Sequence, residues 1–210
     1  QSSHTVLNNS MIYPLGDFMI KGVIWYQGEG NRTRAQKYKD VFSAVIDSFR
    51  EQWKNKDLPF YYVQLAPFGD IAYKRRFKSE FVAELREAQR LTLKKNHVGM
   101  AIIMDVGDSL DIHPLPKKPV GDRLALLALA NDYGYDNLVF SGPLYKDVSF
   151  VNNSALISFK NAESGLLLKN NNLSQFELAG SDKKFFSADA KILDEKVLVK
   201  SNDVINPKYV

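Results

Sequence analysis

The segment from Asp105 to Pro114 concentrates side chains that can transfer protons. It reads Asp105-Val-Gly-Asp-Ser-Leu-Asp-Ile-His-Pro114 and holds three carboxylates and one of the three histidines of the chain. It follows an apolar run, residues 98–104, which is typical of a buried strand. Charged groups gathered where a buried strand ends are costly unless they bind a ligand or take part in chemistry. We therefore expect the acid–base part of a hydrolase site here.

His113 is the candidate base within this segment. Alternate residues of an extended chain point the same way, so Asp111 is placed to orient the imidazole. An oriented imidazole is what a serine esterase needs, first as general base and then as general acid. The alternative is a surface histidine beside an aspartate that caps a helix.

Ser109 is the obvious candidate nucleophile, and we do not assign it that role. Gly107-Asp-Ser-Leu110 spells the nucleophile block of the GDSL esterases and follows a strand as that block does. In that family the block lies on the first strand and the histidine comes far downstream, whereas Ser109 shares one loop with His113. We expect a chance match or a turn residue. His4, in a polar N-terminal tail, and His97, at a helix-to-strand turn, are weaker candidate bases, and the sequence has no Gly-x-Ser-x-Gly elbow.

A second block with chemical potential is Trp25-Tyr-Gln-Gly-Glu-Gly-Asn31, where an aromatic strand runs into polar residues and glycines. The Gln27 amide can donate a hydrogen bond to a developing oxyanion, and Gly28 and Gly30 let the backbone approach a ligand. The alternative is a plain strand-to-helix turn in which Asn31 caps the helix.

The elements that must position these residues alternate between strands and helices. Apolar runs at 22–26, 60–65 and 98–104 predict buried parallel strands, and apolar stripes over 41–53, 81–92 and 120–128 predict helices, the last ended by Gly134. This order predicts an α/β fold, a three-layer α/β/α sandwich whose ligands bind at the carboxyl ends of the strands. After Gly134 the runs 139–140, 148–150, 155–159, 166–168, 176–178 and 192–199 predict antiparallel β structure. We expect two domains, an α/β core over 1–137 and a β-rich region over 138–210.

Two charged clusters need no ligand to explain them. Asp105, Asp108 and Asp111 suggest a hard-cation site, but neither a calcium-loop pattern nor a histidine pair accompanies them, so we predict no metal. Residues Glu84, Arg86, Glu87 and Gln89 are interpreted as a solvated helix face with salt-bridged pairs.

Composition excludes several classes of protein. The 210 residues are 45% hydrophobic and 25% charged, which is typical of a globular protein and not of a disordered or fibrous one. Because the chain has no cysteine, disulfides and thiol nucleophiles are excluded. No apolar run is long enough to cross a bilayer, so we expect no membrane partner. The net charge is +4, and the basic run at 73–78 is interpreted as a solvated loop or the edge of an anionic-substrate site, not a nucleic-acid site.

Several blocks, in this order, make the chain resemble the bacterial sialate O-acetylesterases, a family of SGNH hydrolases with an α/β/α fold. They are Gly22-Val-Ile-Trp-Tyr-Gln-Gly-Glu-Gly-Asn31, Leu85-Arg-Glu-Ala-Gln89, Gly99-Met-Ala101, Asp105-Val-Gly-Asp108, Asp111-Ile-His-Pro114, Val120-Gly-Asp-Arg-Leu-Ala125 and Ser141-Gly-Pro-Leu-Tyr145. The resemblance covers nearly the whole chain, and the first and fifth blocks are the most specific.

The resemblance implies removal of O-acetyl groups from sialic acids or related glycans, without a cofactor. It assigns His113 as general base, with Asp111 as the first choice of orienting carboxylate and Asp108 as the second. It assigns Gln27 as the side-chain donor of the oxyanion hole. Glu29, with Gly28 and Asn31, would fix that loop or bind the substrate. It also implies a periplasmic or secreted protein. An acetylxylan esterase and a non-catalytic glycan-binding module are the alternatives.

Two departures from the family pattern matter. Gly30 stands where the family usually has serine, which changes local hydrogen bonding. The family's nucleophile lies in a Gly-Gln-Ser-Asn block upstream of the Trp-Tyr-Gln-Gly motif, and Ser2, Ser3 and Ser10 do not match that block. We therefore expect this chain to be the C-terminal portion of a larger enzyme, with its nucleophile on an upstream segment, and to be close to inactive alone.

Overall fold

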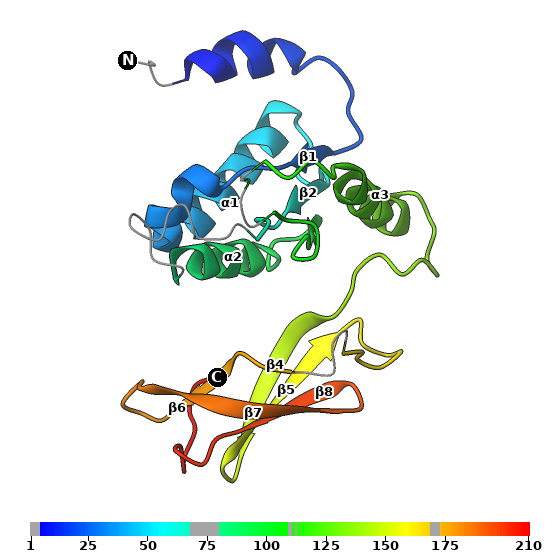
Figure 1. The fold of residues 1–210 in the computed structure, drawn as a ribbon. Helices are drawn as coiled ribbons and strands as arrows, with labels where there is room; N and C mark the ends of the chain where they lie inside the picture. The colour runs from blue at the N-terminus through cyan, green and yellow to red at the C-terminus, as the bar shows by residue number, and fades with distance from the viewer. Residues whose placement is uncertain (1–4, 68–79, 109–110, 112, 169–172) are drawn as a thin grey trace. The chain divides into compact units, whose positions relative to one another are not determined.

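The computed structural model describes residues 5–67, 80–108, 111, 113–168 and 173–210. The chain divides into two compact units, Gln1–Phe140 and Ser141–Val210 (Figure 1). Each unit is described by itself. The assignment of separate roles to residues 1–137 and 138–210 stays a prediction.

The first unit is built on a three-stranded parallel sheet in the order β1-β2-β3. Its strands are β1 (Val23–Trp25), β2 (Phe60–Val63) and β3 (Val98–Ala101). All four residues of β2 are buried, because β2 is the central strand and both faces of the sheet are covered. The predicted parallel sheet is confirmed, although each strand is shorter than the apolar run that predicted it.

Helices cover both faces of this sheet. The helices α1 (Ala35–Gln52) and α2 (Glu80–Thr92) contact each other, while α3 (Lys118–Asp132) contacts β2 and β3 (Figure 1). Short helical turns occupy η1 (Asn8–Ile12), η2 (Tyr13–Leu15) and η3 (Glu29–Arg34). As predicted, α3 is followed by Gly134, whose φ of +75° suits a glycine after a helix end.

The two faces of β2 belong to two different cores. Phe60 and Tyr62 join an aromatic cluster with Trp25 and Phe42, in which the Phe42 and Tyr62 rings meet edge to face with centroids 5.0 Å apart. Tyr61 and Val63 point the other way, into an aliphatic core that includes Val120, Leu124 and Leu127 of α3. This alternation confirms the three-layer α/β/α arrangement.

The second unit is a five-stranded antiparallel sheet in the order β4-β5-β8-β7-β6. Its strands are β4 (Leu144–Val151), β5 (Ser154–Lys160), β6 (Phe176–Ala179), β7 (Phe185–Leu193) and β8 (Lys196–Lys200). A buried cluster contains Ala155, Ile157, Leu178, Val197 and Val199. The predicted antiparallel region is thereby confirmed.

Three details of that prediction were wrong. Residues 192–199 form two strands, because Leu193 pairs with Lys196 around a tight turn in which Asp194 has a φ of +54°. The runs 139–140 and 166–168 lie outside the strands. Apolar residues in a loop that covers a core produce the same short pattern as a strand.

An arginine clamp ties the loop after β3 to α3. The Arg123 guanidinium donates to both carboxylate oxygens of Asp105, at 2.6 and 2.7 Å, and to the Ile102 carbonyl at 2.6 Å. The hydrogen bonds to Asp105 raise the pKa of Arg123. A planar guanidinium can serve both acceptors at once, which a lysine ammonium cannot do with the same geometry.

The packing of β3 against α3 gives a first prediction. A Cβ at Gly99 would lie 2.8 Å from Tyr61 Cδ1 and 3.0 Å from Leu127 Cδ2, so Gly99→Ala should lower the free energy of unfolding of the first unit by about 1–3 kcal/mol. Gly121→Ala on α3 is the matched control, since a Cβ there meets nothing within 4 Å and should raise that free energy by up to about 1 kcal/mol. Urea unfolding followed by tryptophan fluorescence reports on this unit, which holds both Trp25 and Trp53. Equal stability of the two variants would contradict the packing described.

The clamp gives a second prediction. Arg123→Lys should lower the free energy of unfolding by about 1 kcal/mol, because the two-point contact with Asp105 and the bond to the Ile102 carbonyl cannot both be kept. The control is Asp122→Asn, which breaks an exposed pair with Lys118 within α3 and should cost no more than about 0.5 kcal/mol. The same unfolding curves measure both, and a larger loss in the control would refute the clamp.

Candidate active site at the carboxyl edge of the parallel sheet

The Gln27 side chain lies just beyond β1 and is held from two sides. Its Nε2 donates to Asn31 Oδ1 at 2.7 Å. The Tyr38 hydroxyl donates to the Gln27 carbonyl at 3.1 Å and reaches Gln27 Oε1 at 3.4 Å. Because an amide nitrogen carries two hydrogens, one N–H of Gln27 remains for a ligand. The Asn31 side chain therefore orients Gln27, and α1 begins after Arg34 without a side-chain cap.

Gly28 is the residue of this block whose conformation requires glycine. Its φ is +150°, and it is buried. A Cβ at Gly28 would touch Tyr38 Oη and Leu65 Cδ2, both at 3.4 Å, and Gln89 Nε2 at 3.5 Å. A Cβ at Gly30 would meet nothing within 4 Å. The close approach of backbone to neighbouring groups thus occurs at Gly28 and not at Gly30.

Gln89 is a buried brace that the sequence interpretation missed. Its side chain is 1% exposed, its Oε1 accepts from the Leu65 N–H at 3.0 Å, and its Nε2 donates to the Val63 carbonyl at 3.1 Å. The expectation of a solvated face was therefore wrong for Gln89. The helical spacing could have revealed it, since Gln89 falls on the apolar stripe four residues after Leu85 and three before Thr92.

Arg86 braces the chain beyond β2 in a similar way. It donates to the Leu65 carbonyl at 3.0 Å and to the Ala66 carbonyl at 2.9 Å, and its burial lowers the pKa of the guanidinium. Of the residues interpreted as a solvated face, Glu87 does form a surface pair, with Arg90 at 2.6 Å.

Tyr38 is the second residue that the sequence interpretation missed. Burial raises the pKa of its phenol to about 12, and the negative charge of Glu29 adds to that rise. The hydroxyl therefore stays protonated, and a hydrogen-bond donor, at every pH at which a protein of this kind works. Glu29 also raises the pKa of Tyr26, where burial is again the larger cause.

The His113 side chain lies on the loop after β3. It is 87% exposed, and its Nδ1 lies 3.9 Å from Asp111 Oδ1, which is too far for a hydrogen bond but within reach of a charge interaction. The same Asp111 oxygen accepts the His113 backbone N–H at 2.8 Å, which fixes the turn that presents the histidine. Asp108 is exposed on the same loop.

Several candidates from the sequence fall elsewhere. Ser109, His4 and the basic run at 73–78 lie outside the described residues. His97 occupies the turn before β3 with a φ of +53°, and its Nε2 lies 3.5 Å from Asp57 Oδ1.

The Gln27 and His113 loops meet at one edge of the sheet. Both follow strands that flank β2, and the carboxyl ends of parallel strands share an edge. Tyr26, Ala66 and Val106, one from each of the three exit loops, pack against the same core cluster.

Two further contacts bring these loops together. The Lys117 ammonium, just after the His113 turn, lies 5.4 Å from the centre of the Tyr26 ring. Gly107 abuts Pro67 so closely that a Cβ would overlap it. These contacts hold the loops after β1, β2 and β3 together at the edge of the sheet where Gln27 and His113 lie.

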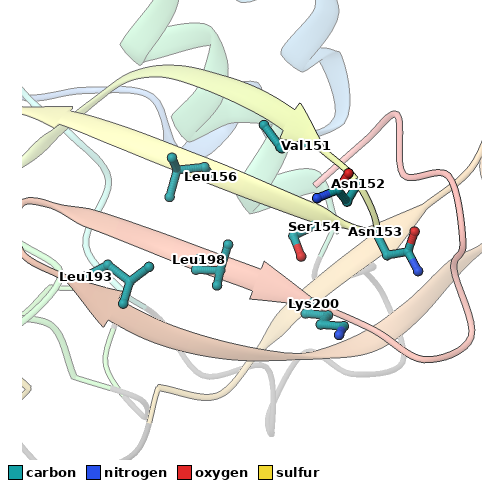
Figure 2. A pocket seen from close by; sticks show the side chains of 8 residues that line it. All are labelled: Val151, Asn152, Asn153, Ser154, Leu156, Leu193, Leu198 and Lys200. Carbon is teal, nitrogen blue, oxygen red and sulfur yellow. The ribbon is translucent and has the colours of Figure 1, made fainter.

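The second unit contains a groove of a different character. Its volume is about 440 Å³. Leu156 and Leu198 line it from the neighbouring strands β5 and β8, and Asn152 and Lys200 lie toward one end (Figure 2). Its lining has no histidine and no carboxylate.

Two general features concern the described part of the chain. No group of three or more His, Asp and Glu side chains in it lies together as metal ligands would. None of its helices is long and apolar enough to cross a membrane.

Comparisons with known proteins identify the family to which this chain is similar. Residues 5–128 match the family described as carbohydrate esterase, sialic acid-specific acetylesterase. Sialate O-acetylesterase of Mus musculus is 32% identical over 177 residues, which is 74% of this chain and 31% of that protein. Sialate O-acetylesterase of Homo sapiens is 33% identical over 175 residues, 75% of this chain and 33% of that protein.

A solved structure is also similar. The crystal structure of a carbohydrate acetylesterase from Xanthomonas citri aligns with a TM-score of 0.87 and 42% identity, covering 96% of this chain and 47% of that one. This chain thus spans about a third of the length of the mammalian relatives and about half of the bacterial one. With the family match extending over more than half of its residues, the chain belongs to the sialic acid-specific acetylesterase family of carbohydrate esterases.

Proposed function

We propose that this chain is the acid–base and oxyanion-binding part of an enzyme that removes O-acetyl groups from sialic acids or related glycans. The observation that carries the proposal is the Gln27 amide. Two neighbours hold it, one of its N–H groups is left for a ligand, and it lies at the sheet edge that also presents His113. By family resemblance, the enzyme would work in the periplasm or outside the cell.

The proposed reaction is acyl transfer to a serine followed by hydrolysis. The serine oxygen attacks the acetyl carbonyl while His113 takes the serine proton, and the Gln27 N–H donates to the oxyanion that forms. His113 then gives that proton to the departing sugar oxygen. Water, deprotonated by His113, attacks the acetyl-enzyme; the bond to the serine oxygen breaks, His113 returns the proton to that oxygen, and acetate is released. Asp111 accepts the His113 backbone N–H and would thereby hold the turn that presents the imidazole to the substrate.

The serine is proposed to lie on a segment upstream of this chain. Support comes from β1, which pairs with β2 alone among the described strands. Ile24 of β1 is 70% exposed, although it lies on the face that α3 covers over β2 and β3. A parallel sheet normally has both faces covered, so a further strand and helix would complete this edge. The 210-residue chain alone would then be close to inactive.

The roles of His113 and Gln27 give a third prediction, tested on a polypeptide that joins this chain to its upstream segment. His113→Ala should lower kcat for acetate release from O-acetylated sialic acid by about 10²–10⁴-fold, because the serine loses its base. Gln27→Ala should lower kcat by about 10²–10³-fold with little change in KM, because the oxyanion forms after the substrate binds. Acetate release measured at saturating substrate gives both numbers.

Two controls accompany this experiment. His97→Ala removes a histidine at the opposite end of β3 and should leave kcat unchanged. Acetylated xylan tested beside O-acetylated sialic acid separates the two substrate classes. Unchanged turnover after His113→Ala, or full turnover by residues 1–210 alone, would overturn the proposed division of the site.

A further inference from the structure

The hydrogen bonding of β2 changes where β1 ends. The last pair between the two strands is Trp25 with Tyr62. The Gln64 N–H donates to the Ala101 carbonyl of β3 at 2.9 Å, so the backbone groups of the flanking Val63 and Leu65 face the β1 side. Without another partner, the Val63 carbonyl and the Leu65 N–H would be unpaired, because β1 has turned away toward Gln27.

The Gln89 amide replaces the missing strand. It accepts from the Leu65 N–H and donates to the Val63 carbonyl, which is the pattern that a neighbouring strand would supply. Its Nε2 also borders Gly28, where a Cβ would lie 3.5 Å away. Because Gln89 pairs these two groups, the chain at Gln27 and Gly28 can turn away from the sheet without leaving them unpaired.

The Tyr38 hydroxyl completes that surface from α1. It donates to the Gln27 carbonyl at 3.1 Å, lies 3.4 Å from Gln27 Oε1, and touches the Gly28 position. The Tyr38 hydroxyl beside Oε1 fixes the orientation of the Gln27 side-chain amide. The amide oxygen faces Tyr38, and the amide nitrogen faces Asn31 and the open side of the loop. Tyr38 is 3% exposed, so water cannot easily substitute for it.

We propose that Tyr38 is a positioning residue for the oxyanion donor: its hydroxyl, backed by the Gln89 amide, holds Gln27 in the orientation that leaves one N–H for the developing oxyanion. This inference rests on the proposed role of Gln27. The phenol remains protonated through neutral and mildly alkaline pH because burial raises its pKa to about 12.

The test is a double-mutant cycle in the polypeptide that includes the upstream segment. Tyr38→Phe keeps the ring and removes the hydroxyl, and it should lower kcat by about tenfold with KM within about twofold. In the Gln27→Ala background the same change should lower kcat by less than about twofold, because the group that Tyr38 positions is gone. Tyr61→Phe is the matched control, since that hydroxyl donates to Asp132 on the α3 side and its removal should leave kcat unchanged.

A second readout does not depend on activity. In ¹H–¹⁵N spectra of the 210-residue chain, the Gln27 side-chain NH₂ signals are identified by their loss in Gln27→Ala. Tyr38→Phe should move these signals, and Tyr61→Phe should leave them in place. Equal losses of kcat in both backgrounds together with unmoved NH₂ signals would overturn the inference and leave the esterase proposal standing. If the joined polypeptide has no esterase activity but Tyr38→Phe moves the NH₂ signals, the esterase proposal is overturned, while the contact by which Tyr38 orients the Gln27 amide stands.

Discussion

The hydrogen bonds between the Gln89 side chain and β2 are the interaction on which the rest of the candidate site depends. A buried strand cannot leave its backbone groups unpaired, since each unsatisfied group costs about 1–3 kcal/mol. Gln89 satisfies the Val63 carbonyl and the Leu65 N–H, so the pairing of β1 with β2 can end at Trp25 while the chain turns outward. The chain can form an open loop at Gln27 because Gln89 of α2 takes the place of β1 as the hydrogen-bond partner of Val63 and Leu65.

The two halves of the site are held by different physics. The Gln27 carbonyl accepts a neutral hydrogen bond from Tyr38, and the loop lies against Gln89, whose amide is bonded to Val63 and Leu65. Neutral hydrogen bonds of this kind are insensitive to salt. The His113 loop is fixed at its start by the Arg123–Asp105 ion pair and at its histidine by one short turn. In the proposed reaction, another segment of the enzyme would complete this site, enclose the imidazole and exclude water.

Much of this architecture could be predicted from the sequence, because the signals involved are local. Apolar runs and helical stripes predicted the parallel strands and the three helices, and the conformation of Gly134 followed from its place after a helix. Gln89 and Tyr38 were missed for a physical reason. A polar side chain on an apolar stripe can be buried or solvated, and its partners on a distant strand decide which. In the second unit, residues 192–199 were predicted as one strand but belong to two. The tight turn at Asp194 and Glu195 interrupts an otherwise continuous alternation of apolar residues.

The central claim is that this chain supplies the base and the oxyanion donor while the nucleophile comes from outside residues 1–210. Fluorophosphonate labelling of the joined polypeptide, with intact mass and peptide mapping of the adduct, tests it most directly. The account predicts one adduct, on a serine upstream of residue 1. An adduct on Ser109 would contradict it and would place a complete catalytic pair on the loop after β3.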